Sequence, residues 1–386
     1  MRLRFPALAT SAAGVALVTA AAGFAHAQLA RRGGEFPVNT VIDGDQRGSR
    51  VVATPDGGFV VIWKGDHIAA RRFDADTRPL APEFGVNSSP IGSEDASVAA
   101  ASDGSFLVAW YGAGVDARYV NPADRPGAQF VVTPQSYVGS GVAAAGGGQF
   151  TVAWTDTDYH AEARLVGPHG QAPSFRINEE GYQYKVAAAG SGDGEYRVVW
   201  FDGGGLIRGR SFIGSQPTAD AFDVANVSST FNQGPVICSD STGGFVVAWA
   251  TYSYGKQDGK AVSYRQYDAT GAPLTDALPI TPEEGPSVQV NPQLACGPGS
   301  DFVVVWGEIP FMPSQTPIRG RAVTPNGPHP SSDFTIRLRD AEDSDGAAVA
   351  ALADGDLLVT WTDCGLPSGC DIFGQRFTSS GATDCP

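Results

Sequence analysis

Short apolar runs alternate with polar turn sequences along the whole chain, and seven of the apolar runs end in tryptophan. Successive tryptophans lie 44 to 57 residues apart, and each closes a run of about five apolar residues. A continuous apolar run of this length is typical of a strand that is buried on both faces. The runs are Phe59–Trp63, Phe106–Trp110, Phe150–Trp154, Tyr196–Trp200, Phe245–Trp249, Phe302–Trp306 and Leu357–Trp361.

Three further strand-like segments accompany each tryptophan run, and we name the four strands a to d in chain order. Strand a consists of small residues, as in Val98-Ala99-Ala100, and a Gly/Asp turn such as Asp103-Gly104 joins it to the tryptophan strand b in most copies. Strand c carries an arginine, and strand d is a short segment of the Phe-x-Val-Asn type, such as Phe84–Asn87. Four strands per repeat is the number found in a β-propeller blade.

The two ends of the repeat set predict how the ring closes. An orphan d strand, Phe36–Asn39, precedes the first repeat, while the seventh copy has strands a, b and c but no strand d. Pairing the two would remove both unpaired sheet edges. The sequence therefore predicts an all-β fold, a seven-bladed β-propeller with four antiparallel strands per blade, whose N-terminal strand completes the C-terminal blade. We expect this single domain over residues 35–386.

The beginning of the chain resembles a secretory signal peptide over residues 1–27. Arg2 and Arg4 precede a run rich in Ala, Val and Leu, and Ala25-His26-Ala27 supplies a small-x-small cleavage pattern. We expect a short linker over residues 28–34, a secreted protein (extracellular or periplasmic) and no transmembrane segment in the mature chain. A permanent membrane anchor is the alternative, but the run is poor in Leu and Ile.

The repeats resemble those of bacterial extracellular proteins that read roughly as Phe-x-Val-Asn, Asp-Gly-Gly-Phe-Val-Val-x-Trp and Ile-x-Gly-Gln-Arg-Phe. Residues 56–63 and 372–377 match these patterns best, and the third copy departs from them with Gly146-Gly147-Gly148 in place of the Asp-Gly turn. The resemblance covers residues 35–381. It implies a propeller fold and an extracellular location, and it brings no catalytic residues with it.

The regular arginine of strand c predicts a structural role, because a residue present in nearly every blade seldom forms a single site. We expect each arginine stem to pack between blades with its guanidinium paired to an acid. This arginine column comprises Arg71, Arg118, Arg164, Arg210, Arg265 and Arg321, with Gln375 in the seventh copy.

Charge narrows the class of partner. The formal net charge is −15, and cleavage after Ala27 would make it −17, because two arginines and no acid are removed. Nucleic acid, which needs clustered Lys and Arg, is therefore excluded as a partner. The b–c and d–a loops share one face of a propeller, here called the top face, and acids gather in them. Calcium is a candidate ligand at Asp43/Asp45 or at residues 342–345, although neither matches a complete ligand spacing; a solvated acidic surface is the alternative.

Loop length marks a candidate binding edge. The b–c loops of blades 5 to 7 are longer than those of blades 1 to 4, and they carry aromatic residues and a methionine where solvent exposure is expected. The alternative is that these side chains fold over the blade edges as local packing. The candidate binding residues are Tyr252, Tyr254, Lys256, Ile309, Phe311, Met312 and Asp363.

The cysteines indicate an oxidising compartment. Cys364 and Cys370 flank a short loop in blade 7, and a disulfide is expected there. Cys238 and Cys296 end equivalent strands of adjacent blades and could form a second one, which leaves Cys385 unassigned.

No arrangement of a nucleophile with its base and orienting group is recognisable in the sequence. We therefore expect a monomeric, secreted binding or adhesion module that recognises an unknown protein or carbohydrate ligand through one propeller face. The alternative from another class is a calcium-dependent hydrolase or glycosidase with acids at the mouth of the tunnel. A purely structural envelope component is a third possibility.

Overall fold

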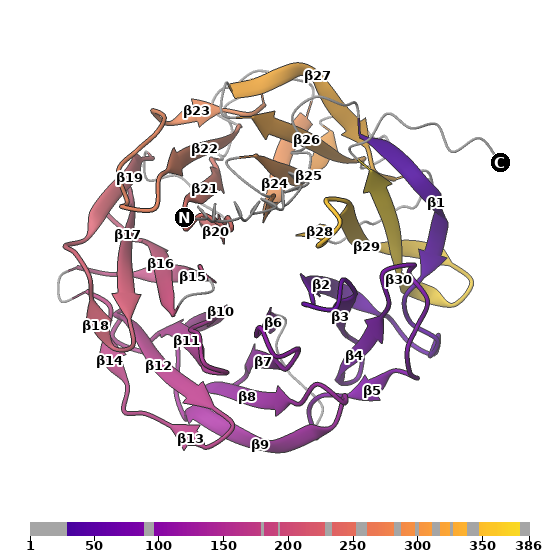
Figure 1. The fold of residues 1–386 in the computed structure, drawn as a ribbon, viewed down its shortest axis with the longest axis horizontal. Helices are drawn as coiled ribbons and strands as arrows, with labels where there is room; N and C mark the ends of the chain where they lie inside the picture. The colour runs from indigo at the N-terminus through magenta and orange to yellow at the C-terminus, as the bar shows by residue number, and fades with distance from the viewer. Residues whose placement is uncertain are drawn as a thin grey trace, which may run out of the picture.

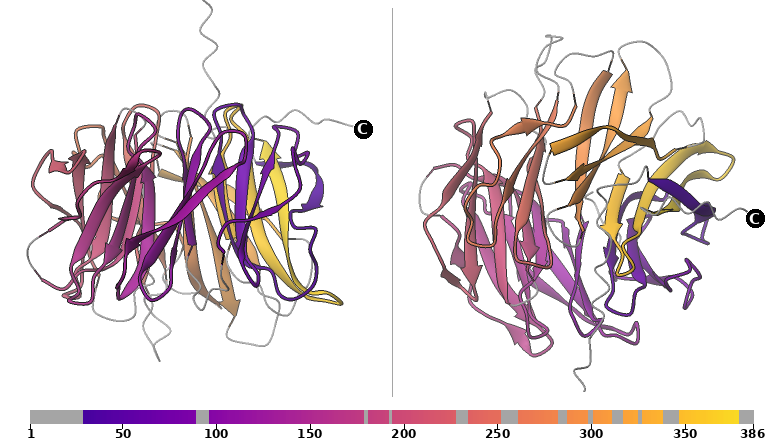
Figure 2. Two further views of the ribbon diagram at one scale, coloured as in Figure 1. Left: turned by 90° about the horizontal axis from the view of Figure 1, so that it is seen from below. Right: turned by 45° about the horizontal axis from the view of Figure 1, so that its top comes forward.

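The computed structural model describes residues 29–88, 96–178, 181–191, 194–227, 234–251, 261–281, 287–297, 301–310, 317–324, 327–337 and 347–378. In these ranges the chain forms seven antiparallel sheets that stand as blades around a common axis (Figures 1 and 2). The predicted seven-bladed propeller is confirmed. The described part of the chain contains no helix that could cross a membrane.

Blades 1 to 6 run outward from the axis in chain order, and blade 7 ends with the N-terminal strand β1. Blade 1 comprises β2 (Arg47–Ala53), β3 (Phe59–Lys64), β4 (Ile68–Phe73) and β5 (Phe84–Gly85). Blade 2 comprises β6 (Ala96–Ala100), β7 (Phe106–Tyr111), β8 (Val115–Val120) and β9 (Pro126–Thr133). Blade 3 comprises β10 (Val138–Ala144), β11 (Phe150–Thr155), β12 (Ala161–Gly167), β13 (Gly170–Gln171) and β14 (Phe175–Arg176). Blade 4 comprises β15 (Tyr184–Gly190), β16 (Glu195–Phe201), β17 (Leu206–Ile213), β18 (Gln216–Pro217) and β19 (Phe222–Asn226). Blade 5 comprises β20 (Val236–Ser239), β21 (Phe245–Ala250), β22 (Val262–Tyr267) and β23 (Leu278–Pro279). Blade 6 comprises β24 (Ser287–Cys296), β25 (Phe302–Pro310), β26 (Ile318–Thr324) and β27 (Gly327–Thr335). Blade 7 comprises β28 (Ala347–Ala351), β29 (Leu357–Leu366), β30 (Gly369–Thr378) and β1 (Ala30–Pro37).

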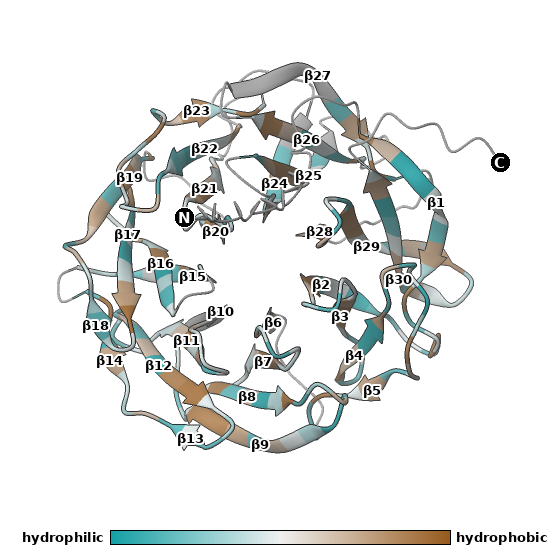
Figure 3. Cartoon of the chain, viewed as in Figure 1, coloured by the Kyte–Doolittle hydropathy of each residue, from teal (hydrophilic) through white to brown (hydrophobic). Residues whose placement is uncertain are grey.

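Packing between neighbouring blades explains the apolar pattern. The tryptophans are 3% exposed or less, and Trp110 of β7 packs with Val60 and Ile62 of β3 in the adjacent blade. Burying one such ring stabilises the fold by at most about 4–6 kcal/mol. In the third strands, buried residues alternate with half-buried ones, as in β17. Figure 3 shows the corresponding bands of hydrophobic and hydrophilic residues along β17.

The N-terminal strand closes the ring as predicted. β1 pairs antiparallel with β30, from Ala30 opposite Thr378 to Pro37 opposite Phe373. The strand begins inside residues 28–34, so most of the expected linker is part of the sheet. The reason is that β30 extends to Thr378 and offers backbone partners to Ala30, Arg31 and Arg32.

The arginine column is structural, but the predicted acidic partner is wrong for most of its members. The guanidinium usually reaches back to the preceding blade and donates to a backbone carbonyl at the end of its fourth strand. Among the described contacts of the column, only Arg321 also pairs with an acid, Asp333, at 2.7 Å from Nη2 to Oδ2. The carbonyl partners are Val38 for Arg71 (2.9 Å), Val86 for Arg118 (2.6 Å), Ile177 for Arg210 (3.1 Å), Val224 for Arg265 (3.0 Å) and Ile280 for Arg321.

Two disulfides cross-link the described chain. Cys364–Cys370 joins β29 to β30 within blade 7, as predicted. Cys238–Cys296 links the innermost strands of blades 5 and 6, so the second pairing that the sequence left open also forms. Cys385 lies outside the described residues. Disulfides persist in oxidising compartments, which fits an extracellular environment.

Candidate functional site

Three tyrosines from three separate loops meet on the top face of blades 3 and 4. Tyr137 precedes β10, Tyr159 lies in the b–c loop of blade 3, and Tyr182 precedes β15. The ring centroids of Tyr137 and Tyr159 are 4.4 Å apart, and those of Tyr159 and Tyr182 are 5.5 Å apart. Tyr137 is 49% exposed and Tyr182 is 65% exposed. We call this continuous aromatic surface the tyrosine strip.

The loop that carries Tyr159 is held by hydrogen bonds from backbone N–H groups to the side chain of Asp156. Asp156 Oδ1 accepts from the backbone N–H groups of Asp158 and His160, both at 2.8 Å. Tyr159 has a φ of +65°, in the left-handed region that favours glycine. The matching turn of blade 4 is built the same way on Asp202 and has Gly205 at the left-handed position. A tyrosine at this position costs strain, which is common where a side chain is needed for function.

Gln183 fixes the neighbouring segment. Its Oε1 accepts from the backbone N–H of Ala161 at 2.9 Å, at the start of the third strand. In blade 1 the Asn87 side chain of the Phe-x-Val-Asn segment likewise accepts a hydrogen bond from the backbone N–H of Ile68, at the start of the third strand. Gln183 also donates its backbone N–H to the Tyr159 carbonyl. Tyr182 is therefore held beside Tyr159 rather than on an independent loop.

The pKa of Tyr159 lies above its ordinary value, first because its side chain hydrogen-bonds to Tyr137. The phenol is neutral at physiological pH and remains able to donate a hydrogen bond.

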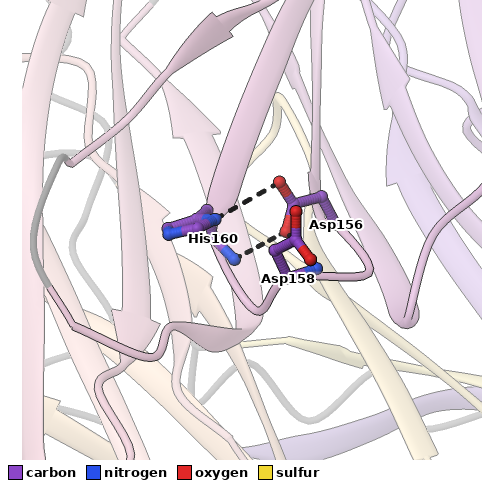
Figure 4. Close-up of side chains that lie close together, drawn as sticks. All are labelled: Asp156, Asp158 and His160. Atoms are coloured by element: carbon purple, nitrogen blue, oxygen red, sulfur yellow. Dashed lines mark hydrogen bonds and ion pairs between the residues drawn. The ribbon is translucent and has the colours of Figure 1, made fainter.

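Asp156, Asp158 and His160 lie in the same loop as Tyr159, and Figure 4 shows their side chains close together. One ligand atom of each lies within 4.8 Å of the others, and within the described ranges this is the one group of three His, Cys, Asp or Glu residues so arranged. His160 Nδ1 lies 3.5 Å from Asp156 Oδ2. The hydrogen bonds of Asp156 to its own turn account for the cluster without an ion.

The acids proposed for calcium from the sequence are placed differently. Asp45 pairs with Arg47, at 3.2 Å between Oδ2 and Nη2, and its Oδ1 accepts from the backbone of Cys370. Asp43 is exposed and belongs to no described cluster of ligands. Residues 342–345 lie outside the described part of the chain.

The binding edge predicted on blades 5 to 7 falls largely outside the described residues. Asp363 is described, but it is 1% exposed in β29, with Oδ1 3.5 Å from Arg337 Nη2. Ile309 of β25 pairs with Val288 of β24, and the side chain of Ile309 is outside the described part of the structure. The candidates that lie outside are Tyr252, Tyr254, Lys256, Phe311 and Met312.

Sequence reasoning missed the tyrosine strip because it ranked the top-face loops by length. The available signal was different: Tyr137, Tyr159 and Tyr182 are aromatic residues in consecutive short top-face loops, where turn residues are expected. Neighbouring loops of one face converge in a propeller, so exposed aromatics in adjacent loops are expected to meet.

The tunnel contains two cavities with different chemistry. The lower cavity, of 460 Å³, opens between the a–b turns, and its described lining is small and uncharged, including Ala53, Ala101 and Leu352. The upper cavity, of 520 Å³, opens toward the top face. Among its described lining residues the ionisable ones are Arg50 and Lys185, and none is a carboxylate.

No protein-family model matches the chain, and no curated protein matches it in sequence. Solved structures do resemble it. A protein of unknown function from Dyadobacter fermentans DSM 18053 has a TM-score of 0.55 at 11% identity, over 91% of this chain and 99% of that one. BBS1N, solved in complex with ARL6DN, has a TM-score of 0.52 at 11% identity, over 92% and 98%. An arginine-to-alanine triple mutant of AofleA from Arthrobotrys oligospora has a TM-score of 0.50 at 8% identity, over 79% and 90%. At these identities the likeness is one of fold alone.

Proposed function

We propose that the chain is a secreted binding protein that holds a glycan or protein ligand against its top face, at the tyrosine strip. The observation that carries the proposal is the convergence of Tyr137, Tyr159 and Tyr182 from three loops into one aromatic surface, in which the two outer rings are exposed. Tyrosine offers a large amphipathic contact area at low conformational-entropy cost, which is why it is enriched in binding surfaces.

Preorganisation supports a binding role. The strip stands on a rigid seven-bladed frame, and its loops are fixed by Asp156 and Gln183 before any ligand arrives. A surface ordered in advance loses less entropy on binding. The alternative of a glycosidase with acids at the tunnel mouth requires paired carboxylates there. The described lining of the upper cavity contributes none.

The test is binding of the mature protein to a broad glycan array, with calcium and with chelator, and to surface proteins in a pull-down. The Tyr137→Ala/Tyr182→Ala variant should lose most of the binding. A matched control is Leu274→Ala, because Leu274 is 54% exposed and lies in the c–d connection, away from the top face. Equal binding by both variants and the wild type would exclude the strip as the site. Binding that disappears with chelator would make the ligand site metal-dependent.

A further inference from the structure

The tyrosine strip leads directly into the upper mouth of the tunnel. Tyr182, at the end of the strip, is three residues from Lys185, which lines the 520 Å³ cavity. Three residues span at most about 11 Å, so the two side chains lie within reach of one short oligosaccharide. The strip and the mouth are therefore continuous parts of the same face.

Lys185 is held in a backbone conformation that lysine rarely adopts. Its φ is +56°, and it occupies the bulge between Tyr184 and Ala187, where β15 shifts register against β16. The same bulge position in β2 and β24 is filled by Gly48 (φ +65°) and Asn291 (φ +50°), the residue types that tolerate this region. Lysine there costs about 1 kcal/mol. Bulges of this kind re-aim a side chain next to functional sites.

Arg50 provides a second cation on the far side of the mouth. It follows the corresponding bulge in β2 and lines the same cavity. β2 and β15 stand on opposite sides of the tunnel in Figure 1, so the two cations approach the cavity from across the ring. Arg50 Nη1 also donates to the carbonyl of Ser49 at 3.0 Å, so its guanidinium is partly held by the backbone of its own strand.

We propose that the tyrosine strip and the tunnel mouth form one site for an anionic carbohydrate, a sugar chain that bears carboxylate or sulfate groups. The sugar rings lie against Tyr137, Tyr159 and Tyr182, and the anionic group enters the mouth between Lys185 and Arg50. Lysine and arginine bind such oxyanions through charge-assisted hydrogen bonds. This inference rests on the proposed function, since it uses the same strip.

Net negative charge does not forbid such a ligand. At physiological ionic strength the Debye length is about 8 Å, so carboxylates far from the mouth are screened. Asp156 and Asp158 lie in the Tyr159 loop, and we therefore place the anionic group in the mouth and not over the strip. The overall charge slows the approach of the anion, and the local cations determine how tightly it is held.

The experiment compares charged and uncharged forms of the same sugar chain by isothermal titration calorimetry. The probes are an oligomer of galacturonic acid with its methyl ester, and a sulfated galactan oligomer with its unsulfated form. We expect one of the charged forms to bind about tenfold or more tightly than its uncharged partner. The carboxylate and sulfate arms show which anion the site prefers.

Variants separate the mouth from the strip. Lys185→Gly should lose about tenfold in affinity for the charged form while thermal stability stays equal or rises, because glycine relieves the backbone. Arg50→Met should lose affinity for the charged form to a similar extent. Arg47→Met is the matched control, since Arg47 lies on the same strand but does not contribute to the described lining of the cavity.

Equal affinity for charged and uncharged chains, or wild-type affinity in both Lys185→Gly and Arg50→Met, would overturn the inference. In that outcome, loss of neutral glycan binding in the tyrosine variant would leave the proposed function intact. Absence of binding to every sugar probe would refute the anionic site and direct the proposed function to protein ligands.

Discussion

Arg31 of β1 lies beside Gln375 of β30, with 3.3 Å between Nη1 and Oε1, and supplies a guanidinium where Gln375 replaces the arginine of the column. Its Nη2 donates to the carbonyl of Ile336 at 2.5 Å. Ile336 corresponds to Val38 and Val86, the acceptors of the column in other blades. The arginine contact at the blade 6–blade 7 junction therefore depends on the N-terminal strand.

Arg31→Ala should lower the free energy of unfolding by about 1.5–3 kcal/mol, because a charge-assisted hydrogen bond to a buried carbonyl is lost. Adding Gln375→Arg should restore most of the loss, since arginine then returns to its usual strand. Differential scanning calorimetry measures both effects. Arg32→Ala is the control: Arg32 is 46% exposed, and its acidic partner Asp356 also pairs with Arg376. A double variant no more stable than Arg31→Ala would show that the guanidinium is not the important group.

Removal of residues 30–37 should convert the protein into an aggregating or molten product. The deletion exposes the edge of β30 and strips Phe36 from its place over Gly374, where an added Cβ would come within 2.6 Å of the ring. Unpaired edges of this kind recruit other chains. Size-exclusion chromatography with light scattering measures the outcome, and a synthetic peptide of residues 29–39 should rescue the monomer. A deleted protein that stays monomeric with an unchanged melting temperature would contradict the closure.

The two disulfides should contribute unequally to stability. Cys238 and Cys296 are separated by 58 residues, whereas Cys364 and Cys370 are separated by 6. Loop-closure entropy then predicts losses of about 4 and about 2 kcal/mol for the two paired Cys→Ala replacements. Denaturant unfolding of each double variant measures the difference. Equal losses would indicate that the link between blades 5 and 6 does not restrict the unfolded chain.

Stability should fall at alkaline pH through Tyr196. Burial raises its pKa from 10.0 to about 12, so the folded state favours the neutral phenol. A raised pKa stabilises the fold fully below pH 10, and this contribution of about 2–3 kcal/mol is lost progressively as the pH rises from 10 to 12. In Tyr196→Phe the free energy of unfolding should depend less on pH between pH 10 and 12 than in wild type. The variant should also be less stable at every pH, because the hydrogen bond from the Tyr196 hydroxyl to the Gly214 carbonyl is lost. Unfolding in urea between pH 8 and pH 12 gives the comparison, and parallel curves would show that Tyr196 does not titrate in this range.

The fold could be predicted from the sequence because its information is repetitive. Each apolar run that ends in Trp predicts a strand buried on both faces, without information from the rest of the chain. The unpaired strand-like segment at Phe36 predicts how the ring closes. The partners of the arginine column were less predictable, because the sequence displays acids but not which backbone carbonyls a fold leaves available. Asp363 illustrates the same difficulty: a carboxylate in a presumed loop lies within β29, facing Arg337.

The candidate site was less predictable than the fold because it depends on the convergence of loops. Tyr137 and Tyr182 are 45 positions apart in the chain, and only the ring brings both to Tyr159. The residue types of Tyr159 and Lys185 do not by themselves predict a left-handed backbone, because neither is typical of a turn or a bulge. Aligning the blades position by position would have shown both as departures from glycine.

The pairing of Ala30 with Thr378 also sets an order of events during synthesis of the chain. Blades 1 to 6 consist of strands that are neighbours in the chain, and each can form as soon as its own segment emerges. The first strand has no partner until the last one has appeared, so it remains an unpaired strand until synthesis of the chain is nearly complete. Completion of the molecule is thus a late, long-range step, the kind that slows folding and leaves intermediates open to misassembly.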